Sequence, residues 1–167
     1  MSQVLKTNTT LHLAKQNFKF SSAHFLIFDE NRAEMLHGHN YRVKIEMDGG
    51  KDQIYGYVID FHVLKKLIKA RLDQWDEHIL LPAQHPDMKH KISLDGKNYE
   101  VRFRDRFYSF PVNEVIWLEI NNTSVENFSY ILAKEFYKEF NKIAKFEWVS
   151  VTVEETDGQS ATTTCRV

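Results

Sequence analysis

Two histidines two residues apart, His37 and His39, have the clearest potential for chemistry in this sequence. They stand at the start of a predicted strand, where side chains at positions i and i+2 point to the same side. Composition alone gives about 0.4 such pairs in a chain with 8 His, so the pair also fits two surface histidines at a strand end. His24 ends the preceding predicted strand, and antiparallel pairing would bring it beside the other two. Three histidines with an open fourth position are the ligand set of a catalytic zinc ion.

The cysteine content restricts the kind of metal site that these histidines can form. A structural zinc site has four protein ligands, commonly with Cys among them. The chain has a single Cys, Cys165, far from the histidines in the sequence. The histidine set is therefore predicted to be catalytic if it binds metal. One Cys also excludes an internal disulfide framework and fits a reducing, cytoplasmic location.

The overall composition excludes several classes of protein. The 167 residues include 22 basic and 23 acidic side chains, and this near balance argues against a general nucleic-acid binder. No run approaches the roughly 18 apolar residues that a membrane span needs, so no membrane partner is expected. Residues 1–16 lack the apolar segment of a signal peptide. We expect one globular domain over residues 1–167.

Alternating apolar residues predict the strands that would position the histidines. A first strand is predicted over residues 9–20, in a segment that runs on to His24, and a second over residues 41–47. Residues 55–59 form a short extended run, and residues 147–154 predict the last strand.

Two amphipathic helices are predicted from apolar residues that recur at three and four positions. The first covers roughly residues 61–75, with Asp60 as its N-cap. The second begins near Ser124, where Thr123 and Glu126 have the spacing of a capping box. The strands and helices are partly segregated along the chain, which predicts an α+β fold with a mainly antiparallel sheet.

A polar insertion, residues 83–115, separates the two helices. Asp95-Gly96 lies between alternating flanks there, which is a strong β-hairpin signal. Residues 115–120 predict one more strand after the insertion.

Three arginines alternate within the insertion: Arg102, Arg104 and Arg106. Guanidinium groups suit the geometry of phosphate, so one interpretation is a phosphate-binding strand face. Edge strands also carry charge simply to prevent pairing between sheets. We favour the second interpretation.

Five short motifs occur along the chain: F-S-S-A-H (20–24), L-H-G-H-N-Y (36–41), G-Y-V-I-D-F (56–61), V-E-N-F (125–128) and V-x-V-x-E-T (151–156). Together they resemble the 6-pyruvoyltetrahydropterin synthase family, which includes the 6-carboxytetrahydropterin synthases of queuosine biosynthesis. The resemblance spans residues 18–162 and is weakest over 83–115.

This resemblance implies the tunnelling fold, a four-stranded antiparallel sheet with two helices on one face, here with a β-hairpin insertion. It implies assembly into trimers and then homohexamers, with active sites between subunits. It also implies zinc on His24, His37 and His39, and a substrate that is 7,8-dihydroneopterin triphosphate or a related pterin. The implied activity is that of a carbon-oxygen or carbon-carbon lyase acting on the pterin side chain.

The sequence departs from the family at its usual base, a Cys four residues before the first His of H-G-H. That position is Ala33, which has no ionisable group. Glu34 follows, and the segment resembles a branch of the family with Glu in place of Cys, implied to form 6-hydroxymethyl-7,8-dihydropterin for folate. A carboxylate beside zinc is a reasonable general base. The alternative for Glu34 is an ordinary loop acid.

Other site residues follow from the resemblance. Glu155 matches the residue that anchors the pterin through two N–H bonds, a bidentate pairing that orients a flat ring. Asp76 and His78 are the candidates for an Asp-His proton relay, although Glu77 stands where His would be expected. The alternative for His78 is a helix-end histidine that binds a backbone carbonyl. By family position the pterin pocket would also be lined by Thr123, Ser124 and Glu126, although helix capping alone would explain Thr123 and Glu126.

Three functions remain open at this point. The first is a zinc-dependent lyase acting on a pterin. The second is a non-catalytic zinc-containing pterin- or purine-binding protein that lost its base, as Ala33 suggests. The third is an unrelated His-rich zinc protein, in which the match at Glu155 would be coincidental.

Overall fold

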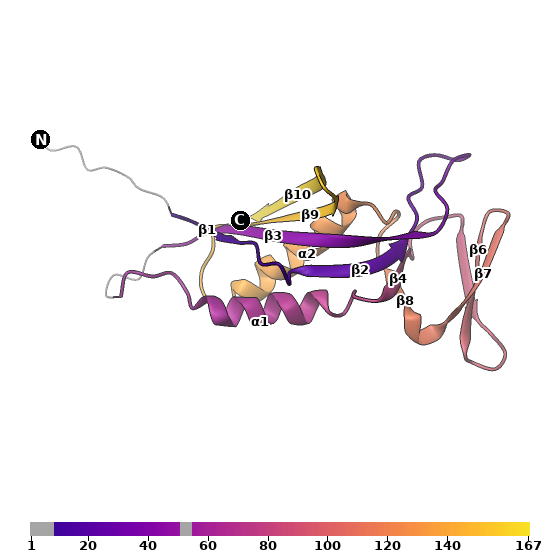
Figure 1. Cartoon of the computed structure of the whole chain (residues 1–167), viewed down its shortest axis with the longest axis horizontal. Coiled ribbons are helices and arrows are strands. Elements are labelled where there is room, and N and C mark those ends of the chain that lie inside the picture. The colour runs from indigo at the N-terminus through magenta and orange to yellow at the C-terminus, as the bar shows by residue number, and fades with distance from the viewer. Residues whose placement is uncertain (1–8, 51–54) are drawn as a thin grey trace, which may run out of the picture.

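The computed structural model describes residues 9–50 and 55–167, and within these ranges the chain forms ten strands and two α-helices (Figure 1). In chain order the elements are β1 (Thr10–Leu13), β2 (Lys19–His24), β3 (His37–Asp48), α1 (Phe61–Leu72), β4 (His78–Pro82), β5 (Met88–Ile92), β6 (Asn98–Phe103), β7 (Arg106–Pro111), a 3₁₀ helix (Val112–Glu114), β8 (Val115–Leu118), α2 (Val125–Phe140), β9 (Trp148–Thr156) and β10 (Gln159–Arg166). Neither helix combines the length and apolar character that crossing a bilayer requires.

Seven strands form the main sheet, in the order β10-β9-β3-β2-β4-β8, with β1 also paired to β3. The antiparallel part, β2, β3, β9 and β10, corresponds to the predicted four-stranded sheet. That prediction was incomplete, because β4 pairs with β2 and β8 with β4, both in parallel. Parallel neighbours need a crossover connection, and α1 lies in the segment between β2 and β4.

Both helices pack on the same face of this sheet, as the fold prediction requires. Alternate residues of β3 point to one face, and α1 and α2 contribute to the same core as these residues. The helices cover the sheet with aliphatic and aromatic side chains spaced three and four apart. Members of this core are Tyr41, Val43, Ile45 and Met47 from β3, Leu64, Ile68 and Leu72 from α1, and Phe128, Leu132, Phe136 and Phe140 from α2.

Several element boundaries differ from the sequence prediction. The single strand predicted over 9–20 is two strands, β1 and β2, separated by residues 14–18. No strand forms over 55–59, where Gly56 has a φ of +71° that an extended strand does not have. The first helix ends at Leu72 instead of 75, and strand β10 was not predicted.

The N-cap predicted for α1 is confirmed, and the one predicted for α2 is wrong. Asp60 caps α1, since its carboxylate accepts from the backbone N–H of His62. The residue that caps α2 is Ser124, whose hydroxyl accepts from Asn127 N, so the capping box predicted between Thr123 and Glu126 is wrong.

The insertion forms a separate three-stranded antiparallel sheet, β5-β6-β7, at one end of the molecule (Figure 1). Its first hairpin turns at Asp95-Gly96, as predicted, with Gly96 at a φ of +73°. The insertion shares a second hydrophobic core with the loop between β2 and β3, residues 25–36 (the base loop). This core contains Phe25, Ile27, Leu81, Met88, Val101, Phe103 and Val115.

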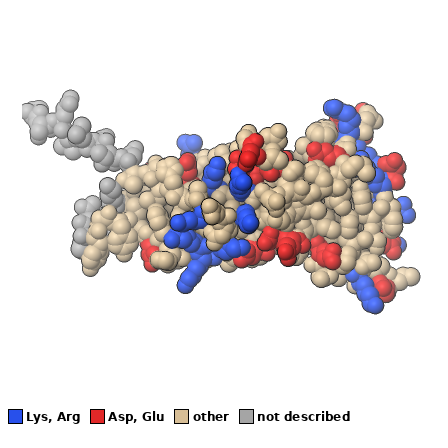
Figure 2. All heavy atoms as spheres, viewed as in Figure 1, with Lys and Arg blue, Asp and Glu red and all other residues tan. Residues whose placement is uncertain are grey.

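The charged side chains are mixed on the molecular surface seen in Figure 2, where Lys and Arg lie close to Asp and Glu over much of the visible face. Arg71 of α1, for example, pairs with Glu135 of α2. Mixed charge of this kind creates no extended field of one sign on that face.

Candidate active site

Strand pairing brings the three predicted metal ligands together. His24 on β2 lies directly opposite His37 on β3 in the antiparallel register, and His39 follows two residues along β3 on the same side. One ligand nitrogen from each imidazole lies within 4.8 Å of the others. The Nε2 atoms of His37 and His39 are 2.8 Å apart. The i, i+2 spacing and the strand end at His24 therefore produce the cluster that the sequence predicted.

Backbone carbonyls orient two of the imidazoles. The Nδ1 atom of His24 is 2.7 Å from the carbonyl oxygen of Thr123, and the Nδ1 atom of His37 is 2.8 Å from that of Met35. A carbonyl only accepts, so each Nδ1 carries a proton, and Nε2 is the nitrogen of each ring that remains available to a metal. This is the usual arrangement around metal-ligating histidines, where the second ring nitrogen is hydrogen-bonded and fixes the ring.

The burial of His24 fits a metal ligand. Its residue is 1% exposed, and burial lowers the pKa of its imidazole, which favours the neutral form that metals require. Its buried Nε2 makes no hydrogen bond within the described part of the chain, and the Glu155 oxygen that lies 3.1 Å from it is also an acceptor. A buried nitrogen without a partner is costly unless something else binds its lone pair. Three imidazoles that converge from two strands are a donor set that suits zinc.

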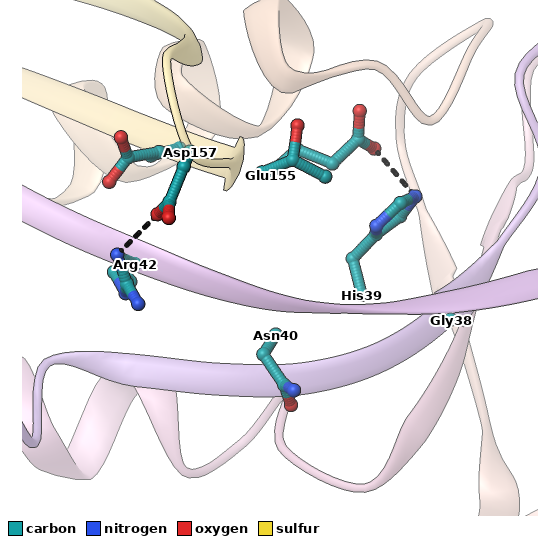
Figure 3. A pocket seen from close by; sticks show the side chains of 8 residues that line it. Gly38, His39, Asn40, Arg42, Glu155 and Asp157 are labelled. Atoms are coloured by element: carbon teal, nitrogen blue, oxygen red, sulfur yellow. Dashed lines mark hydrogen bonds and ion pairs between the residues drawn. The ribbon is translucent and has the colours of Figure 1, made fainter.

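Glu155, on β9, points toward His39 of the neighbouring strand β3, and a dashed line marks their contact in Figure 3. Its Oε1 atom lies 3.1 Å from His24 Nε2 and 3.6 Å from His39 Nε2, and it accepts a 3.1 Å hydrogen bond from the Tyr41 hydroxyl. Burial, together with the nearby Glu155 carboxylate, raises the pKa of Tyr41, so the hydroxyl stays protonated and remains a donor. Figure 3 shows Asn40 on the other side of the β3 ribbon from His39.

Glu34 lies on the base loop, on another side of the cluster. Its Oε2 atom is 3.8 Å from His37 Nε2 and accepts a 2.9 Å hydrogen bond from the backbone N–H of Leu26. About a third of the side chain (34%) is exposed, so a ligand from solvent can reach it. Ala33 beside it forms an isolated bridge with Ile27. The structure thus brings Glu34 to the histidines.

Asp76 and His78 lie near the cluster but do not form a relay through their side chains. The Asp76 carboxylate accepts from the backbone N–H of Ser21 at 2.6 Å, and His78 Nδ1 is 2.6 Å from the backbone oxygen of Asp76. No hydrogen bond joins the two side chains within residues 9–50 and 55–167. Both belong to the turn into β4, where Glu77 has a φ of +59°. His78 lines a hollow that it shares with His39.

The three candidates at the start of α2 differ in their surroundings. Thr123 is fully buried, and its hydroxyl donates to the carbonyl of Phe25 at 2.9 Å, while its own carbonyl holds His24. The Ser124 hydroxyl caps α2. Glu126 is exposed in the first turn. Thr123 therefore supports His24 from behind, and contact of any of these three with a pterin stays a prediction.

The sequence did not predict the role of two residues that hold the base loop, Asn122 and Arg106. The Asn122 side chain both accepts from and donates to the backbone of Ile27, at 3.0 and 2.7 Å. Arg106 donates to the carbonyls of Ala33 and Glu34. Arg102, Arg104 and Arg106 do not share one strand face, because Arg104 lies in the turn between β6 and β7. The sequence feature that could have pointed to Arg106 was its place in an insertion to which the sequence assigned no role.

Comparison with known proteins gives this cluster its context. Residues 13–165 match the family described as 6-pyruvoyl tetrahydropterin synthase. The chain belongs to this family. The resemblance drawn from the five motifs is therefore confirmed, and it extends over the insertion.

Tetrahydropterin synthases are also found among individual relatives. A putative 6-carboxy-5,6,7,8-tetrahydropterin synthase of Methanocaldococcus jannaschii is 30% identical over 145 residues, which are 86% of this chain and 87% of the relative. A 6-carboxy-5,6,7,8-tetrahydropterin synthase of Rickettsia typhi is 29% identical over 119 residues, 71% of this chain and 75% of the relative. The names place this chain among tetrahydropterin synthases as a class.

The fold agrees with solved structures of the family. The crystal structure of Plasmodium vivax 6-pyruvoyltetrahydropterin synthase has a TM-score of 0.88 and 29% identity, covering 97% of this chain and 100% of that one. Variants of the same P. vivax protein, in which a glutamate described as a catalytic residue is replaced by Ala or Cys, match with the same TM-score and 28% identity.

Proposed function

We propose that this chain is a zinc-dependent lyase that acts on 7,8-dihydroneopterin triphosphate or a closely related pterin. The product would be a 6-substituted pterin of the carboxy, pyruvoyl or hydroxymethyl type. The observation that carries the proposal is the arrangement of two carboxylates around one histidine cluster. Glu155 lies 3.1 Å from His24 Nε2, and Glu34 lies 3.8 Å from His37 Nε2.

In this proposal His24, His37 and His39 hold zinc through their Nε2 atoms. Zinc, when bound, would polarise an oxygen of the pterin side chain and lower the pKa of its hydroxyl. The carbonyls of Thr123 and Met35 keep the rings in the required tautomer.

Glu155 orients the substrate. Its carboxylate accepts two N–H bonds from the pterin 2-amino group and ring nitrogen, a charge-assisted pair that fixes the plane of the ring. The Tyr41 hydroxyl occupies one lone pair of Oε1, which restrains the rotation of the carboxylate. The pterin side chain then extends toward the histidine cluster, of which His39 borders the same hollow as Glu155.

Glu34 takes a proton from the substrate side chain as general base. A base must come within about 2.6–3.2 Å of the group that it deprotonates, and Glu34 is close enough to the cluster for a small movement to achieve this. Support comes from the P. vivax relative, for which a glutamate is described as catalytic. Ala33 cannot supply a thiolate, so we propose that side-chain cleavage to 6-hydroxymethyl-7,8-dihydropterin is the main outcome.

We further propose that the active protein is a homohexamer in the cytoplasm. The main sheet leaves strand edges at β10 and β8 within the described chain, and joining such edges around a ring would remove them. Asp76 and His78 could then complete the relay in the assembled site. Light scattering at micromolar concentration tests this, and a monomer would contradict it.

The experiment that tests the function is direct. The purified protein is loaded with zinc, incubated with dihydroneopterin triphosphate, and its products are identified by mass spectrometry. We expect turnover that a chelator removes and that added zinc restores. Tight pterin binding without any product would instead favour the alternative, a non-catalytic zinc-containing pterin- or purine-binding protein. If the protein neither binds nor turns over the pterin, the pterin assignment itself is wrong.

A further inference from the structure

Within the base loop, residues 25–36, Leu26 is the partner of Glu34: its backbone N–H donates to Glu34 Oε2 at 2.9 Å. The loop is a narrow hairpin in which Glu34 N donates to Leu26 O at 2.9 Å and Phe28 N donates to Arg32 O at 3.0 Å. Between these bonds it has a single bridge, Ile27 with Ala33. A two-stranded hairpin is only marginally stable by itself. The Glu34 carboxylate is therefore placed only as firmly as this hairpin, and contacts from outside the loop are needed to hold the hairpin itself.

Arg106, the first residue of β7, supplies such a contact from the insertion. Its Nη1 donates to the carbonyl of Glu34, and its Nη2 donates to the carbonyl of Ala33 at 3.1 Å. One planar guanidinium thus binds two consecutive carbonyls, which a single ammonium group cannot do with the same geometry. Holding both carbonyls fixes the peptide between Ala33 and Glu34, and with it the direction of the Glu34 side chain.

The guanidinium of Arg106 rests on a rigid surface. It lies 5.8 Å from the ring centroid of Phe103, which is 1% exposed in the second hydrophobic core. Phe103 in turn packs against Phe25, at 5.0 Å between ring centroids, so the insertion and the base loop share one packed interior. A functional side chain is best held when its supporting residues are themselves locked by packing.

We propose that Arg106 is a positioning residue that holds Glu34 in its catalytic place, which gives the 83–115 insertion a role in the reaction. This inference rests on the proposed function, in which Glu34 is the base. Misplacing a catalytic group by about 1 Å can cost on the order of 10²-fold in rate. Arg106 would therefore affect the chemical step and leave zinc and pterin binding, which other elements provide, largely unchanged.

Arg104, in the turn between β6 and β7, offers a matched control because it also contacts the base loop. Its Nη2 donates to the carbonyl of Asp29 at 2.6 Å, and its Nε pairs with Asp87 at 2.9 Å. It joins the insertion to the tip of the base loop, five residues before Glu34. A general loss of loop stability should affect both arginine variants, whereas a loss of Glu34 positioning should affect Arg106 variants alone.

The test compares steady-state kinetics of Arg106→Ala and Arg104→Ala in the zinc-loaded protein. We expect kcat of Arg106→Ala to fall about 10- to 100-fold, with KM and zinc content unchanged, and Arg104→Ala to stay within about threefold of the parent. Arg106→Lys should remain close to Arg106→Ala, because Lys keeps the charge but not the paired donors. Equal losses in the two alanine variants, or full activity in Arg106→Lys, would overturn the proposal.

A double variant tests whether Arg106 acts through Glu34. Adding Arg106→Ala to Glu34→Gln should cost nothing further, because residues that act as a unit are not additive. A further loss of the usual size would show an independent role and overturn the proposal. Should Arg106→Ala fail to fold, Arg106→Lys and its double variant carry the same comparison.

The two proposals fail in different ways. If Glu34→Gln keeps full turnover, the base assignment is wrong and the positioning role is lost with it. If Glu34→Gln is impaired while Arg106→Ala is normal, only the role of Arg106 is wrong. If no pterin is turned over at all, the proposed function itself is wrong, and Arg106 has no base to position.

Discussion

The three histidines and Glu34 surround the same small volume, but different parts of the fold hold them. The histidines lie on β2 and β3, in the interior of a seven-stranded sheet, where ladder hydrogen bonds fix their backbones. Glu34 lies on a loop that is fixed by side chains from the insertion and from Asn122. If the proposed function holds, the sheet positions the metal ligands, whereas the base loop and the insertion position the base.

The largest effect is expected from His37→Ala. Removing one of three ligands should reduce zinc to background and abolish turnover, while the fold persists because the His37 side chain is 36% exposed and supports little of the core. Metal analysis and thermal unfolding check this prediction together. His12→Ala is the matched control, because His12 pairs with Glu46 at an exposed position away from the site. Full zinc occupancy in His37→Ala would show that His37 is not a zinc ligand.

The next largest effect is expected from Glu34→Ala. Loss of a general base typically costs about 10²–10⁴-fold in rate, and zinc should be retained because Glu34 is not a ligand. Single-turnover rates and zinc content measure the two quantities separately. Cys165→Ser is the control, since burial raises the pKa of the Cys165 thiol and keeps it a poor nucleophile. If Glu34→Ala reacts at the parent rate, the turn containing Asp76 and His78 is the next place to look.

A third effect concerns the substrate and not the metal. Glu155→Gln keeps the shape of the side chain but places an amide N–H against a pterin N–H, which leaves donors unpaired. The expected loss of pterin affinity is about 2–4 kcal/mol, or roughly 30- to 1,000-fold. Calorimetry on the zinc-loaded protein measures it. Glu154→Gln is the control, because that neighbouring acid pairs with Lys44 instead of the histidines.

The same contrast explains what the sequence could predict. The histidine site followed from local periodicity, because the side-chain period of a strand is 2 and both His37 and His39 obey it. The two helices followed from their apolar stripes and from Asp60. The strand β8 was predicted, but β4 and the parallel pairing were not, because β4 follows a helix end closely and nothing in its five residues specifies the direction of its neighbour.

Other parts of the structure depend on contacts that a local pattern does not contain. Arg106 and Glu34 are 72 residues apart, so their contact arises only when the insertion folds against the base loop. Strand β10 was a missed signal of a different kind. Asp157-Gly158 has hairpin-turn chemistry, with Gly158 at a φ of +83°, and the threonines that follow are good strand formers.

A smaller effect is expected from Thr123→Val, which separates structural support from substrate contact. The variant removes the hydroxyl that bonds to Phe25 O but leaves the backbone carbonyl that holds His24. We expect a loss of about 1–3 kcal/mol in the free energy of unfolding, because a buried carbonyl loses its partner. Zinc affinity and pterin affinity should change little. A large loss of pterin affinity at unchanged stability would instead make Thr123 a pocket residue.

The smallest effect is expected from Ser124→Ala. Its hydroxyl accepts from Asn127 N as the N-cap of α2, and losing a Ser cap typically costs about 1 kcal/mol of stability. If capping is its whole role, urea denaturation should show that loss while pterin affinity and kcat stay at parent values. Ser124→Asp is the matched control, since Asp caps a helix as well as Ser and should restore stability. The two roles separate cleanly, because a pterin contact through the hydroxyl would be lost in both variants, whereas a cap would be lost only in the first.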